Sequence, residues 1–215
     1  MNTELLLRLN NLVESEKLLA LVPMGAIISI IIGVFSLTES TRRTLSFAYA
    51  DPSLWTAYTA PFVHLSAAHL TGNIAVFLLV SGTFYALSRH TRTPWLFLGA
   101  LVAALSIFPV TLSLLNLAVP RDAVTYGFSG VNMALVGFLP TAIGRYMEAK
   151  RGRPVDTTLL LTAFFVSVGG IAILAVPRSA LTLAVGTSGV ALSVLFGWAF
   201  VRRERRLTDT RERWR

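Results

Sequence analysis

The 215-residue sequence contains no cysteine and few charged residues. Without cysteine, neither a disulfide framework nor a thiolate metal site can form. Only 14% of the residues are charged and 54% are hydrophobic, whereas soluble domains usually carry about 25% charged residues. This shortage of charge excludes a disordered chain and an ordinary water-soluble globule.

The charged residues that are present leave long parts of the chain empty. Six intervals contain no Asp, Glu, Lys or Arg, and the shortest of them has 21 residues. A helix needs roughly 20 apolar residues to cross a bilayer, so each interval can supply one span. The sequence therefore predicts an all-α membrane protein with six transmembrane helices, near residues 18–38, 67–88, 94–117, 127–147, 157–177 and 180–201.

These spans predict three regions along the chain. Residues 18–201 form the membrane domain, and residues 202–215 form an Arg-rich tail. In residues 1–17, leucines at helical spacing are compatible with a short interfacial helix or with a loose tail. We expect no internal repeat and no interrupted pair of helices, which are features of inverted-repeat transporters.

The basic residues predict how the protein is oriented. With six spans, 15 of the 19 Lys and Arg residues fall on the side of the two termini, so the positive-inside rule makes both termini cytoplasmic. We expect a multi-pass protein of the plasma membrane. The net charge of +8 has the same origin, and the Arg-rich tail carries a single aromatic residue, Trp214. A nucleic-acid-binding surface would interleave aromatic and basic side chains, so we expect the lipid bilayer, and no nucleic acid, as a partner.

Three histidines lie at the ends of the second predicted span. His64 and His69 are at its outer start with Asn73, and His90 is at the cytoplasmic end among arginines, where we expect a solvated boundary residue. His69 and Asn73 are one helical turn apart and share a face. Both can donate hydrogen bonds. Such a pair could stabilise an oxyanion, or it could bond to neighbouring helices and serve packing.

A second polar motif, YGFSG at residues 126–130, lies at the outer start of the fourth span. The glycines beside Ser129 allow close backbone approach, and free N–H groups at a helix N-terminus favour negative charge. Small residues in membrane helices also serve packing. Because the second and fourth spans both begin on the outer side, we expect Ser129 at the depth of His69 and Asn73.

Together, the runs LWTAYTAPFVHLSAAHLTGN (54–73) and GFSG (127–130) resemble the rhomboid family of intramembrane serine proteases. That family has a His-x4-His-x3-Asn second helix and a Gly-x-Ser-Gly fourth helix, in a six-helix core with both ends in the cytoplasm. The resemblance covers roughly residues 45–201. It implies Ser129 as the nucleophile, an oxyanion hole formed by His69, Asn73 and the backbone at Ser129, and His64 and Gly127 as supporting residues.

The sixth span departs from the family pattern. Active rhomboids take their general base from a histidine in the sixth helix, in a pattern resembling Ala-His-x-Gly-Gly ahead of small residues spaced by four. Aligning Gly189, Ser193 and Gly197 with those small residues puts Gly186 at the histidine position. Many active members also have an aromatic residue four positions after the serine, where this chain has Met133.

Three interpretations of function follow. A serine hydroxyl needs a proton acceptor within about 3 Å, and no predicted span contains a charged residue that could replace the histidine. The first interpretation is therefore a rhomboid-like pseudoprotease that binds transmembrane segments of other proteins. The second is an active serine endopeptidase with His64 or His69 as an unusual base. The third is a small-solute transporter, which would need intramembrane charge or a broken helix pair. We expect no metal and no organic cofactor.

Overall fold

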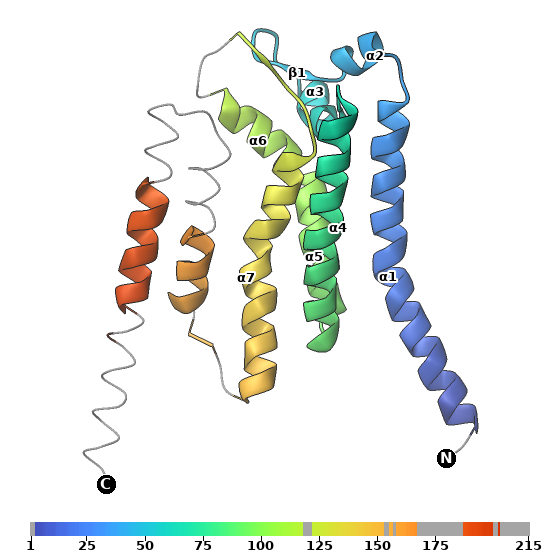
Figure 1. Ribbon diagram of the computed structural model, residues 1–215, viewed down its shortest axis with the longest axis vertical. Helices are drawn as coiled ribbons and strands as arrows, with labels where there is room; N and C mark the ends of the chain where they lie inside the picture. Colours follow the sequence, from blue (N-terminus) through green and yellow to red (C-terminus); the bar gives the residue numbers. More distant parts are fainter. Residues whose placement is uncertain are drawn as a thin grey trace. The chain divides into compact units, whose positions relative to one another are not determined.

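The computed structural model describes residues 3–117, 122–152, 155–156, 158–166, 187–199 and 202, and these are mostly helical (Figure 1). The chain divides into two compact units, Met1–Val136 and Gly137–Arg215. Both polar motifs found in the sequence lie in the first unit.

The described elements follow one another from α1 to α7. They are α1 (Thr3–Phe35), α2 (Glu39–Thr44), β1 (Phe47–Ala48), α3 (Leu54–Thr59), the 3-10 helix η1 (Ala60–Phe62), α4 (Ala67–His90), α5 (Pro94–Ser106), α6 (Phe108–Asn116), β2 (Val124–Thr125) and α7 (Ser129–Arg151). Residues 158–166 and 187–199 are also helical.

Short polar side chains and proline set the starts of the helices around the site. The Ser66 hydroxyl accepts a hydrogen bond from the His69 N–H at 3.3 Å and so caps α4. Ser53 caps α3 in the same way through the Thr56 N–H at 3.1 Å. Pro94 occupies the first turn of α5, where a missing N–H is no loss. The cap at Ser66 thus places His69 in the first turn of α4.

Helix α4 packs against both α1 and α5 (Figure 1). Aromatic pairs lie at two of its contacts, with the Phe84 and Phe97 centroids 5.9 Å apart towards α5 and the Phe77 and Phe128 centroids 5.4 Å apart towards the start of α7. All four rings are fully buried. Edge-to-face pairs of this kind contribute roughly 0.5–1.5 kcal/mol beyond the area they bury. Phe128 therefore anchors the chain directly before Ser129.

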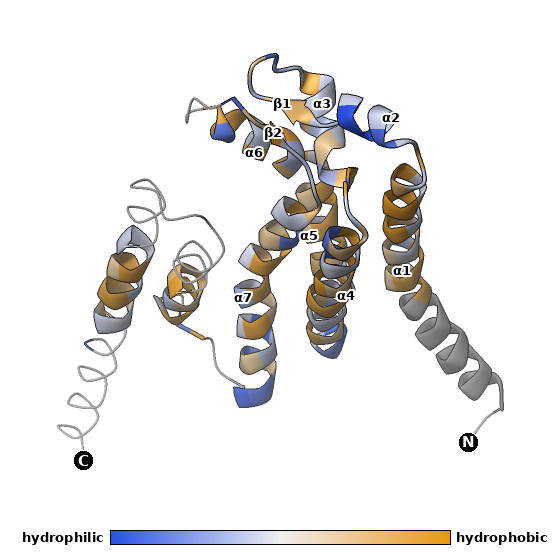
Figure 2. Ribbon diagram, turned by 45° about the horizontal axis from the view of Figure 1, so that its top comes forward, coloured by the Kyte–Doolittle hydropathy of each residue, from blue (hydrophilic) through white to orange (hydrophobic). Residues whose placement is uncertain are grey.

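Among the described residues, α4 is the one helix that is both long and apolar enough to cross a membrane. It coincides with the span predicted at residues 67–88. Helices α5 and α6 meet the same criterion only as a pair, which is bent by 42°. Figure 2 shows apolar residues along α4 and α5 and hydrophilic residues on α2.

The bend between α5 and α6 corrects two expectations. We predicted one span over residues 94–117 and no interrupted helix, but the chain breaks at Ile107. Pro109 in the first turn of α6 explains the break, because it lacks an N–H and its ring would clash with the preceding turn. The bent pair has no counterpart elsewhere in the described ranges, so the matching pair of an inverted repeat is not seen there.

The other predicted spans are described in part. The apolar stretch Ala20–Phe35 belongs to α1, which is continuous from Thr3, so residues 3–17 and the first span form one helix. Helix α7 covers the fourth span from Ser129. For the fifth and sixth spans, only residues 158–166 and 187–199 are described. The count of six spans and the orientation stay predictions, and the tail from residue 203 lies outside the described residues.

A two-residue ladder holds the strand that leads to Ser129. Strand β1 pairs antiparallel with β2, Phe47 with Thr125 and Ala48 with Val124. The Gly127 N–H adds a hydrogen bond to the Ala60 carbonyl at 3.0 Å. These backbone bonds attach the start of α7 to the segment between α2 and α4.

Candidate functional site

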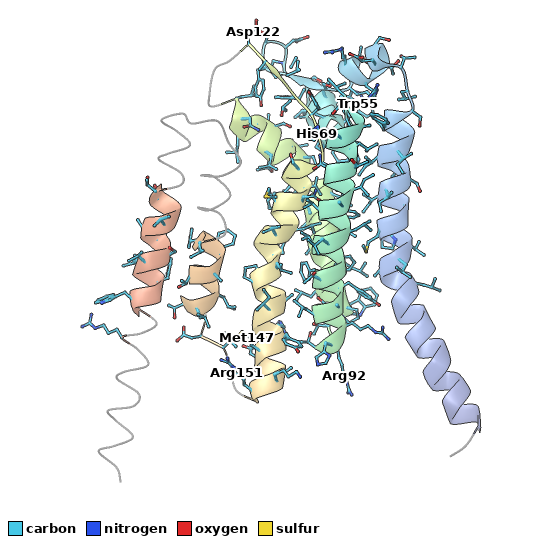
Figure 3. The ribbon with its side chains drawn as sticks, in the orientation of Figure 1. Trp55, His69, Arg92, Asp122, Met147 and Arg151 are labelled. Atoms are coloured by element: carbon cyan, nitrogen blue, oxygen red, sulfur yellow. The ribbon has the colours of Figure 1, made fainter. Side chains whose placement is uncertain are left out.

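The two polar motifs meet at one end of α4. His69 lies in the first turn of α4, whereas Arg92 follows the opposite end of this helix (Figure 3). His90 is the last residue of α4 and is exposed. It is therefore a full helix length from the other two histidines.

Asn73 lies at the centre of the buried hydrogen bonds of this site. Its amide nitrogen donates to His64 Nε2 at 3.1 Å and to the His69 carbonyl at 3.1 Å. A side-chain amide has two N–H groups, so both are engaged within the protein. Donation by Asn73 to an oxyanion would require the exchange of one of these bonds.

His64 is fully buried in the loop before α4. Its Nε2 accepts the bond from Asn73 and a second, at 3.4 Å, from the Phe128 N–H. Because both partners are donors, Nε2 is unprotonated and the neutral ring carries its proton on Nδ1. The acceptor nitrogen of His64 is thus occupied from two sides.

The surroundings of His64 also make its ring a weak base. Burial disfavours the imidazolium ion, and the neighbouring His69 ring adds to this, so the pKa of His64 is lowered from 6.5 to about 4. The Phe62 backbone opposes the shift, although Nδ1 has no partner of normal hydrogen-bond geometry in the described part of the chain. His64 is therefore neutral at physiological pH.

His69 has a different environment. It is only partly buried, and its ring lies edge-on to His64 and Tyr126, with centroid separations of 5.0 and 5.8 Å. The ring rests on Gly127, where an added Cβ would come within 2.5 Å of the His69 Cε1. Gly127 also has a φ of +106°, a region that favours glycine. The first glycine of the motif thus makes room for His69.

Ser129 is the first residue of α7 and its side chain is exposed. No hydrogen bond links its hydroxyl to any of the three histidine rings, all of which lie in the described part of the chain. The first N–H groups of a helix have no partner within the helix and favour nearby negative charge. The position therefore suits a nucleophile or an anion, but nothing described is bonded to the hydroxyl as a base.

Two residues of this site were not predicted from the sequence. Asn132, on α7, is 1% exposed and donates to the Asn73 carbonyl at 3.0 Å and to Asn73 Oδ1 at 3.4 Å. Arg42, on α2, donates from Nη1 to the His64 carbonyl and lies over the Phe35 ring at 4.6 Å. The available signals were a polar side chain within a predicted span and an arginine on the side that the sequence predicts to be outer.

The remaining predicted positions lie away from these contacts or outside the described residues. Met133 is described on α7 and is 38% exposed. Gly186 lies outside the described residues. In the second unit, Ser193 is buried, and a Cβ added at Gly197 would meet Thr162 at 3.6 Å. No cluster of three or more His, Cys, Asp or Glu side chains that could hold a metal ion occurs among the described residues.

The fold and the site define a mostly helical protein that presents a serine at a helix N-terminus beside a buried histidine–asparagine pair. A family model described as the rhomboid domain matches residues 51–203, which is most of the chain. The chain therefore belongs to the rhomboid family and is an integral membrane protein. Searches of the curated proteins and of the solved structures find no match.

Proposed function

We propose that this rhomboid-family protein is a pseudoprotease that binds transmembrane segments of other membrane proteins. The observation that carries the proposal is the engagement of His64. Its one acceptor nitrogen receives hydrogen bonds from Asn73 and from the Phe128 N–H, so it has no free lone pair for the Ser129 proton. Loss of a member of such a catalytic unit typically lowers kcat by around 10⁶.

The polar residues of the site have a structural use that does not require catalysis. The bonds among His64, Asn73 and Asn132 join the loop before α4 to α4 and to α7. A buried polar group in a membrane helix lowers stability unless it forms hydrogen bonds within the protein. A protein that binds client helices without cutting them needs this rigid frame but no base, which is consistent with the glycine aligned at position 186.

A cleavage assay in liposomes tests the proposal. The substrate is a single-span peptide with helix-destabilising residues, and the enzymes are the wild type and Ser129→Ala. The control is Ser106→Ala, which removes an exposed hydroxyl whose described hydrogen bond lies within its own helix, α5. We expect no serine-dependent product and no fluorophosphonate labelling of Ser129. Product that is lost in Ser129→Ala and kept in Ser106→Ala would refute the pseudoprotease.

Binding is tested separately from cleavage. Because the chain has no cysteine, one engineered cysteine at the exposed Thr83 of α4 gives a single labelling position. Energy transfer from this label to a labelled single-span peptide should exceed transfer to a polyleucine span of equal length. Equal transfer to both peptides would contradict selective binding of destabilised segments.

A second candidate function is an active intramembrane serine endopeptidase with His69 as its base. The observation that favours it is the contact of the His69 ring with Gly127, two residues before Ser129, while neither ring nitrogen forms a hydrogen bond within the described ranges. If serine-dependent cleavage occurs, His69→Ala should abolish it, because no other described imidazole has a free acceptor nitrogen beside Ser129. Serine-dependent cleavage that persists in His69→Ala would exclude His69 as the base.

A further inference from the structure

The buried side chain of Asn132 forms hydrogen bonds to Asn73, which an apolar side chain at this position could not form. It lies three residues after Ser129 and is 1% exposed. Its Nδ2 donates to two oxygen atoms of Asn73, whereas its Oδ1 is buried without a partner among the described residues. A leucine of similar size would bury no unpaired oxygen. The use of the amide therefore lies in the bonds that its nitrogen makes.

These bonds determine which way the Asn73 amide points. Asn132 Nδ2 is a donor, so the atom of Asn73 that faces it must be the carbonyl oxygen Oδ1. The Asn73 nitrogen then faces His64 Nε2 and the His69 carbonyl. If the Asn73 amide were reversed, its nitrogen would face the Asn132 nitrogen, and both are donors. Its oxygen would face the His69 carbonyl oxygen, and both are acceptors. Each partner thus favours the same orientation.

The same bonds hold Ser129 between two attachments of α7 to the site. One residue before it, the Phe128 N–H donates to His64. Three residues after it, Asn132 donates to Asn73. Interhelical bonds of this kind are typically worth about as much as a good packing contact in a membrane, and here they fix the height of Ser129 along α4.

We propose that Asn132 is a positioning residue of the Ser129 site: it holds α7 on α4 and keeps the Asn73 N–H groups directed at His64 and at the His69 carbonyl. The inference rests on the proposed function in one respect, which is that Ser129 marks the functional site. The hydrogen bonds of Asn132 and Asn73 are present whether or not the protein cleaves or binds a client. Asn132 acts through Asn73, and no hydrogen bond joins its side chain to the Ser129 hydroxyl in the described part of the chain.

The test is the ¹⁵N resonance of His64 Nε2 in the full chain labelled at histidine. The chain has three histidines, so the ring signals can be assigned by substituting His69 and His90 in turn. Loss of the Asn73 donor in Asn73→Ala should move the Nε2 resonance. We expect Asn132→Leu to move it in the same direction by a comparable amount. Val131→Ala, a fully buried neighbour on α7 without polar atoms, should leave it unchanged.

An Asn132→Leu spectrum with His64 at its wild-type position, while Asn73→Ala moves it, would overturn the inference. If Asn132→Leu does not fold, Asn132→Thr serves in its place, because threonine lacks the amide fork but keeps a branched side chain. A double-mutant cycle of Asn73→Ala and Asn132→Ala gives a second readout, in which the unfolding equilibrium constants should be non-additive by roughly 3- to 30-fold. Additive effects would also overturn it. The resonance needs no cleavage or binding, so its failure is distinguishable from failure of the proposed function.

Discussion

His64 and His69 are the same residue type, five positions apart, with ring centroids 5.0 Å apart, yet their surroundings differ. His64 is fully buried, and its Nε2 accepts two hydrogen bonds. His69 is partly buried and contacts its neighbours through its ring faces and edges. The difference teaches that two histidines of one motif can have separate uses. His64 completes the frame of the site, whereas the ring nitrogens of His69 have no hydrogen bond among the described residues.

The largest expected effect comes from removing the ring that forms the frame. His64→Leu leaves the Asn73 amide and the Phe128 N–H without their buried acceptor. An unpaired buried donor costs roughly 1–3 kcal/mol, so we expect a loss of about 3 kcal/mol in the free energy of unfolding. Reversible unfolding in mixed micelles measures it. A loss no larger than that of His69→Leu would remove the distinction between the two histidines.

The next largest effect is expected at Gly127. In Gly127→Ala, the new Cβ would meet the His69 ring, and φ = +106° would be strained for alanine. We expect a loss of about 2 kcal/mol, with displacement of His69 and no direct effect on the His64 bonds. The unfolding measurement gives the energy, and the histidine ring resonances give the displacement. Unchanged His69 signals would contradict the contact.

A smaller effect is expected from pH. The pKa of His64 is about 4 in the folded protein and 6.5 when unfolded, so between these values the unfolded chain binds a proton that the folded chain does not. The free energy of unfolding is therefore unaffected by this group above pH 6.5. It decreases as the pH falls towards 4, by about 1.4 kcal/mol per pH unit. At pH 5.5 we expect a loss of about 1.4 kcal/mol in the free energy of unfolding, measured by thermal unfolding in detergent.

The control for this pH dependence is His64→Gln, whose side chain does not titrate. The part of the slope that belongs to His64 should be absent in this variant, although its stability at pH 7 will be lower. A slope equal to that of the wild type would assign the dependence to other groups.

The smallest effect on stability is expected from His69→Leu. The ring is partly exposed and its described contacts are van der Waals and edge-to-face, so we expect a loss below about 1 kcal/mol. We expect the free energy of client binding, measured by the energy-transfer assay, to change more than the free energy of unfolding. A loss of stability as large as that of His64→Leu would show that both rings belong to the frame.

The sequence predicted the parts of this site that depend on helix periodicity. Spacing alone put His69 and Asn73 on one face, and alternation of spans put Ser129 at their depth. In the structure, α4 and the start of α7 meet at this point, with Gly127 against His69. The bend at Ile107 was not predicted, although Pro109 in the sequence was a signal for it.

Other features depend on how helices are rotated about their axes. Whether Asn132 faces α4 depends on the phase of α7, and the direction of the Asn73 amide depends on three partners that come from different elements. The pairing of Phe47 with Thr125 joins two short segments that have no strand signal of their own. Such contacts follow from the packed arrangement and not from local pattern.

The ladder between β1 and β2 has a consequence for the biosynthesis of the protein. Its partners are separated by about 77 residues of chain. Since ribosomes add about 5–20 residues per second, β1 emerges roughly 4–15 seconds before the strand that completes it. During that interval its backbone N–H and C=O groups form an open edge. The serine site therefore assembles only after helices α1 to α6 have been made, and a chain that stalls between α6 and α7 leaves β1 unpaired and open to binding by a chaperone.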